Sequence, residues 1–228
     1  MEELSAKASS HLTPYAIVAL QECERMNVIW REIKRSLIEL KLGLSGELTM
    51  SNDMEQLENA LFTDKIPTKW TKRSYPSLLG VQNWFSDLLL RAQELEIWTS
   101  SFSLPPVVWL GGFFNPQSLL TAVMQQTARR HGYALDRMSL NCDVTRKTKS
   151  EIGIAPQEGI NIHGLHMEGA QWDVESAAIV EASLMKLTAE VPVMYLRAVI
   201  SEKWREKKNN THLPHKTQVM VALKSPGY

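Results

Sequence analysis

Histidine and cysteine are the residue types in this sequence most able to do chemistry. His163 and His166 are three residues apart, as are His212 and His215, and Cys142 is a possible fifth ligand. Such a set could bind zinc. However, 163–166 reads as β-strand, where a spacing of three puts side chains on opposite faces, and the second pair lies in a polar loop. We therefore predict surface histidines and no metal site.

Cys142 is also the candidate nucleophile, because a thiol can attack a carbonyl group when a nearby histidine activates it. Together with Met138, Leu140 and Val144 it alternates with polar neighbours, a pattern typical of a strand, and this favours a core thiol over a reactive one. The Gly-x-Ser-x-Gly elbow of serine hydrolases is missing. No catalytic residue is assigned, and a small cysteine- or metal-dependent hydrolase remains the alternative.

The stretch 109–130, WLGGFFNPQSLLTAVMQQTARR, could be a glycine loop that holds a phosphate at the start of a helix. A P-loop requires a lysine after its last glycine, and neither Gly111 nor Gly112 has one at that spacing. Pro116 also removes one N–H donor from the start of the helix. The sequence therefore predicts a structural corner between a buried segment and a packed helix, without a bound cofactor.

Two short basic runs, 68–73 and 203–208, each contain a tryptophan, a combination that can stack on nucleic-acid bases. The formal net charge of the whole chain is +0, which argues against a basic binding footprint. We predict that the lysines of both runs are solvated, that Trp70 and Trp204 pack inward, and that nucleic acid is not a partner.

The 228 residues are 44% apolar and 22% charged, which is ordinary for a globular protein. Cys23 and Cys142 form no disulfide framework, so a reducing compartment is expected. The N-terminus lacks a signal-peptide pattern, and no apolar run is long enough to span a membrane. We therefore expect a soluble intracellular protein, or a piece of one, that does not contact membranes.

Helical spacing of apolar residues dominates the first part of the chain. Four helices are predicted: over 14–42 with Thr13 as N-cap and a stop at Gly43, from about Asn52, after Pro76, and from Pro116 to Gly132. The apolar stripe of the second includes Met54, Leu57, Leu61 and Phe62. After Gly132 the apolar residues alternate at 138–144, as in a strand, and strands are also predicted at 160–167, 191–201 and 217–223. Helices followed by strands predict the α+β class.

The order of several motifs resembles the C-terminal region of dynein heavy chains, most closely the axonemal, outer-arm type. The resemblance covers roughly residues 12–200 and is carried by four segments: IPTKW at 66–70, SYPSLLGVQNWFSDLLLRAQELEIW at 74–98, the stretch at 109–130, and GLHMEGAQWD at 164–173.

This resemblance implies an N-terminal helical bundle over 1–132, followed by a small antiparallel β-barrel or barrel-like sheet over 133–228. It also implies a domain that is not an enzyme and has no nucleotide site. Its partners would be the AAA+ ring modules of the parent heavy chain, which hydrolyse ATP, and microtubules would be reached only through the parent motor. The domain would brace the ring and tune movement of cilia or flagella, within the cytoskeleton of the axoneme.

The resemblance is weaker near the C-terminus, where Leu213–Thr217 departs from the family pattern. A last strand is therefore expected to be absent or replaced, which would leave an open barrel edge. Because no ring module precedes Met1, we expect either an excised piece of a longer protein or a short product. An independent adaptor without a motor is the other alternative.

Overall fold

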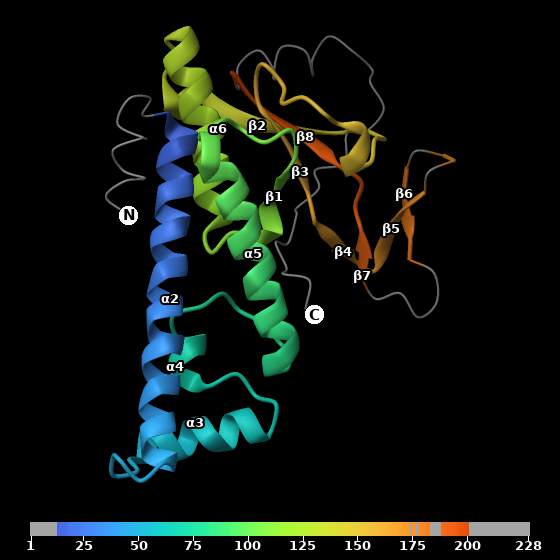
Figure 1. Ribbon diagram of the computed structural model, residues 1–228. Coiled ribbons are helices and arrows are strands. Elements are labelled where there is room, and N and C mark those ends of the chain that lie inside the picture. Colours follow the sequence, from blue (N-terminus) through green and yellow to red (C-terminus); the bar gives the residue numbers. More distant parts are fainter. Residues whose placement is uncertain (1–12, 174, 177, 183–187, 201–228) are drawn as a thin grey trace.

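A computed structural model describes residues 13–173, 175–176, 178–182 and 188–200 (Figure 1). Helices occupy the first part of the chain and strands the last part, which confirms the α+β class. The strands form one sheet of four strands and two of two strands, and the described strands do not close into a barrel. The barrel expected from the resemblance is therefore not confirmed, and the strand predicted at 217–223 lies outside the described residues.

The longest element is helix α2, Pro14–Leu44. It begins where the sequence predicts, because the Thr13 hydroxyl accepts a hydrogen bond from the N–H of Ala16 and proline fits the first helical position. The predicted stop at Gly43 is slightly early: the helix includes this glycine and ends at Leu44. Its buried face carries Glu22, Glu32 and Ser36 as well as apolar residues.

Helix α3, Asn52–Phe62, crosses the lower end of α2 (Figure 1). It begins where the sequence predicts, and its N-cap is Ser51, whose hydroxyl accepts from the N–H of Met54. Met54 and Leu57 are buried as predicted, but Phe62 is 90% exposed, so its place in the predicted apolar stripe is wrong. The sequence also did not predict the short helix α4, Thr68–Thr71.

Helix α5, Val81–Ser101, lies beside α2 (Figure 1), and it buries Trp84, Leu88 and Leu95. Strand β1, Val108–Trp109, and the 3-10 turn Leu110–Gly112 then lead into helix α6, Pro116–His131. Gly132 ends α6 in a left-handed conformation with φ of 68°. This confirms the predicted corner and the predicted extent of α6.

The four-stranded sheet has the order β1-β3-β8-β2, in which only the β1–β3 pair is parallel. The strands not yet bounded are β2 Met138–Val144, β3 Ile160–His163, β4 His166–Glu168, β5 Ala170–Asp173, β6 Ala178–Glu181, β7 Thr188–Glu190 and β8 Met194–Ile200. Strand β4 pairs with β7, and β5 pairs with β6. Within the described residues, no helix is both long and apolar enough to cross a bilayer.

Two clusters of buried side chains stabilise the fold. The first joins the start of α2, through Tyr15, Val18 and Ala19, to α6 and the four-stranded sheet. The second lies within the helices and contains Trp70 and Trp84, whose rings stack with centroids 5.9 Å apart. Helix α2 contributes to both clusters, so it connects the sheet to the far end of the helical part.

Candidate functional site

The predicted corner, which contains Gly111 and Gly112, is built around the indole ring of Trp109, which is buried. Gly112 lies against one part of this ring, where an added Cβ would come within 2.6 Å of Trp109 Cε3. Gly164, between β3 and β4, lies against another part, and a Cβ there would overlap Trp109 Cδ1 and Nε1. Gly112 and Gly164 therefore permit close packing of Trp109 between the corner and the sheet. The corner is not an open loop.

The carboxylate of Glu22 occupies the start of helix α6. Its two oxygens accept hydrogen bonds from the backbone N–H groups of Phe114, at 2.5 Å, and Asn115, at 3.1 Å. Glu22 is only 1% exposed. An anion is favoured at a helix N-terminus, and here the chain's own side chain from α2 supplies it. The N–H groups of Phe114 and Asn115 are therefore not available to a phosphate.

Burial raises the pKa of Glu22 above its ordinary value. The two backbone hydrogen bonds, and the positive charges of Arg25 and Arg91, act in the opposite direction. Desolvation outweighs the opposing effects because the carboxylate is almost completely buried. Glu22 therefore links α2 to the corner.

Arg91, on α5, is a second buried charge beside the corner. Its Nε donates to Asp87 Oδ2 at 2.7 Å, one helical turn earlier. Its guanidinium carbon lies 3.5 Å from the centroid of the Tyr75 ring and 5.1 Å from that of Trp109. A desolvated cation over aromatic faces is stabilising, so Arg91 holds Tyr75, from the segment between α4 and α5, close to Trp109 of the corner.

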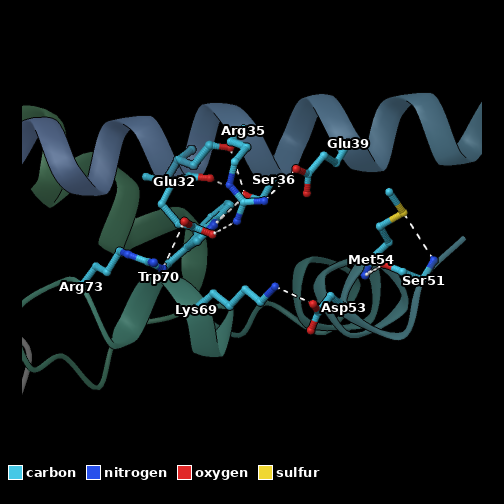
Figure 2. Close-up of polar contacts among 11 residues, drawn as sticks. Glu32, Arg35, Ser36, Glu39, Ser51, Asp53, Met54, Lys69, Trp70 and Arg73 are labelled. Atoms are coloured by element: carbon cyan, nitrogen blue, oxygen red, sulfur yellow. Dashed lines mark hydrogen bonds and ion pairs between the residues drawn. The ribbon is translucent and has the colours of Figure 1, made fainter. Parts of the chain in front are cut away.

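A polar network ties α4 to α2 and α3 (Figure 2). Trp70 is 2% exposed and donates from Nε1 to Ser36 Oγ at 2.9 Å. The buried carboxylate of Glu32 binds Arg73 at 3.1 Å, and Lys69 binds Asp53 at 2.6 Å. This confirms that the tryptophan of the run 68–73 packs inward, where it cannot stack on a base. The run 203–208 lies outside the described residues.

The sequence did not single out the two buried charges, Glu22 and Arg91, as functional residues from their spacing. A signal exists for each, because Glu22 lies on the same helical face as Ala19, Met26 and Ile29, and Arg91 on that of Leu88 and Leu95. A charge on an apolar helix face indicates a buried partner. The partners of Glu22, however, are more than 90 residues away in the sequence.

The predicted surface position of the histidines is wrong for His163, which is half-buried at the end of β3. Within the described residues, its Nε2 is buried without a hydrogen-bond partner. His166 begins β4 on the other side of Gly164, and no group of metal-ligating side chains was found in the described part of the chain. His212 and His215 lie outside that part.

The predicted core position of Cys142 is wrong, because its side chain is exposed on β2. The β-strand predicted around it is confirmed. Partial desolvation by neighbouring atoms, and then the negative charge of Asp143, raise the pKa of the Cys142 thiol to about 11. A thiol with this pKa is almost fully protonated near neutral pH and is a poor nucleophile.

We predict that His163 makes the fold sensitive to acid. Burial, and then the charge of Lys149, lower the pKa of His163 from 6.5 to about 4, while Glu94 acts in the opposite direction. The unfolded chain therefore takes up a proton as pH falls from about 6.5 to 4 and the folded chain does not, so stability is lost over this window. His163→Gln should reduce that loss by about 1–2 kcal/mol, allowing for the hydration of a half-exposed ring.

Urea unfolding of the unaltered chain and of His163→Gln, at intervals between pH 4 and pH 8, measures this effect. Equal losses of unfolding free energy in the two proteins across the window would contradict the assignment.

Comparison with known proteins places these features in a family. The family model for the C-terminal domain of dynein heavy chains matches residues 1–219. The ciliary dynein beta chain of Tripneustes gratilla is 55% identical over 203 residues, which are 89% of this chain and 4% of that protein. The human axonemal dynein heavy chain 9 is 54% identical over 201 residues, or 88% of this chain and 4% of that one.

The flagellar outer-arm dynein beta chain of Chlamydomonas reinhardtii is 46% identical over 190 residues, covering 83% of this chain and 4% of its own length. The chain thus spans only a small fraction of the relatives that it matches. Both the family match and the high identities cover most of the chain, including the corner and the sheet. The chain therefore belongs to the family of C-terminal domains of dynein heavy chains.

Proposed function

We infer that this chain is a non-catalytic domain that packs on the AAA+ ring of an axonemal dynein heavy chain and tunes ATP-driven movement along microtubules. The observation that carries this proposal is the binding of Glu22 at the start of α6. At the one helix start where the sequence suggested a phosphate site, the donors bind a buried side chain of the same chain. The site is arranged to fix the corner in place.

Three further features support a bracing role. The helices and the sheet share a cluster of buried residues, the buried Arg91 contacts aromatic rings from two segments, and the exposed Cys142 is poorly suited to nucleophilic attack. No catalytic, cofactor-binding or metal-binding residue is assigned. The partners are the ring modules, with microtubules reached through the parent motor, and neither nucleic acid nor a membrane is a partner. The location is the cytoskeleton of the axoneme.

We expect the 228-residue chain to show no ATP turnover above background and no binding of a fluorescent ATP analogue, because the N–H groups of Phe114 and Asn115 at the start of α6 already bind Glu22. The measurements are a coupled phosphate-release assay and fluorescence anisotropy. The heavy chain of Tripneustes gratilla serves as the positive control. Turnover that co-purifies with the chain and disappears in a Glu22→Ala or Cys142→Ala variant would contradict the proposal.

A further inference from the structure

The outward face of helix α5 carries almost no charge. Its ten exposed residues between Gln82 and Ser101 include Leu89, which is 49% exposed, and Ile97, which is 59% exposed, and only Glu96 is charged. Of the eleven exposed residues of α2, by contrast, six are charged: Glu24, Arg25, Arg31, Lys34, Arg35 and Lys41. Depletion of charge with exposed aliphatic residues distinguishes the core of an interface from ordinary surface.

A groove runs between α5 and α2 beside this face and encloses about 500 Å³. Cys23, Met26 and Trp30 of α2 line one side, and Ala92 and Leu95 of α5 line the other. Glu96 and Ser100 also line the groove, so the groove and the exposed face of α5 are continuous. Phe85 supports the ring of Trp30 edge-on, with centroids 5.6 Å apart. A groove between two helices accepts the side-chain ridge of a third helix.

We propose that the outward face of α5 and this groove together bind one amphipathic helix from the rest of the heavy chain. A basic residue of that helix contacts Glu96. The inference rests on the proposed function. The matched relatives contain many segments that could supply such a helix, since the matched region is only 4% of the length of the Tripneustes gratilla protein. An aliphatic stripe on the helix fits Leu89 and Ile97, and a single cation among apolar residues fits the single carboxylate.

A second copy of this chain is a poorer occupant. A symmetric dimer uses the same surface on both copies. The exposed residues of α5 include no lysine or arginine, so the same face on a partner copy would leave both Glu96 carboxylates without a cation. The charge pattern therefore favours a heterologous helix.

The test measures binding of this chain to the Tripneustes gratilla heavy chain prepared without the region that matches it. The heavy chain is immobilised, and the 228-residue chain is added with and without Leu89→Lys plus Ile97→Lys. We expect this pair to weaken binding about 30-fold or more, because two interface side chains would become buried charges. The matched control is Val28→Lys plus Leu44→Lys, at α2 positions that are 40% and 61% exposed, and it should change binding by less than about threefold.

All four substitutions are at exposed positions, so thermal unfolding confirms that each variant is folded. Equal binding by the α5 variant and the unaltered chain would overturn the inference and leave the proposed function intact. Absence of binding by the unaltered chain would contradict both. If sedimentation shows a dimer of this chain, and the α5 substitutions dissociate it, the occupant of the groove is a second copy. That result would also overturn the inference. A Glu96→Lys variant that binds as tightly as the unaltered chain would show that the predicted ion pair with Glu96 does not form.

Discussion

Glu22→Ala is expected to lower the free energy of unfolding by about 3–5 kcal/mol. The substitution removes the acceptor of two backbone N–H groups, those of Phe114 and Asn115. A buried ion pair can be replaced by apolar side chains at little cost, but backbone N–H groups cannot be mutated away. Both donors would remain without this partner at the start of α6, and Arg91 would lose a nearby negative charge.

Chemical unfolding followed by circular dichroism measures this effect. Glu24→Ala is the control, because Glu24 lies two residues further along the same helix and is exposed, and it should change stability by less than about 0.5 kcal/mol. Glu22→Gln should give an intermediate loss, since its carbonyl oxygen can still accept one bond but its amide group is a donor that faces another donor. A Glu22→Ala protein as stable as Glu24→Ala would show that the link is dispensable.

Gly159→Ala is expected to cost about 4 kcal/mol or more, or to prevent folding. Gly159 has a φ of +75°, and a Cβ there would overlap the backbone carbonyl oxygen of Leu196 in β8. The adjacent residue, Ile160, pairs with Leu196 in the four-stranded sheet. Because the obstacle is backbone in a paired strand, it cannot move aside without breaking the β3–β8 pairing.

Two other glycines separate the causes of this loss. Gly132 has a φ of +68° and no atom within 4 Å of an added Cβ, so Gly132→Ala should show only the backbone strain, about 1 kcal/mol. Gly153 has neither constraint, and Gly153→Ala should be close to neutral. Urea unfolding of the three variants gives the ranking. A Gly159→Ala protein no less stable than Gly132→Ala would show that the sheet yields at this point.

Local features of the fold could be predicted from the sequence because their causes lie within a few residues. Thr13 and Pro14 mark the start of α2, and Pro116 marks that of α6. The predicted start of α3 near Asn52 is confirmed, and the hydroxyl of Ser51, the residue before it, caps the helix by accepting from the N–H of Met54. Phe62 fits the helical period but lies at the last turn, beyond the side chains that would cover it.

The site depends on contacts between distant segments, which residue spacing does not encode. Trp109 packs against Gly164, and Glu22 binds Phe114, and neither pair has a local signature. The prediction for Cys142 failed for a related reason. Leu140 and Val144, on the same face of β2, pack against the first buried cluster, but the side chain of Cys142 between them is exposed. Alternation along a strand shows which residues share a face, but not how completely that face is covered. The arrangement of the small sheets likewise depends on pairings such as β4 with β7, which join segments about 20 residues apart.

The length and continuity of helix α2 determine how it transmits force. Its 31 residues give a continuous rod about 46 Å long, and it is held near one end by Tyr15 and Val18 and near the other by Ile33 and Leu40. A load applied at the sheet would reach α3 without crossing a hinge, because no break interrupts the helix between these points. A neighbouring domain that displaces one end of α2 would therefore move the other end, because the helix rotates as one rigid body.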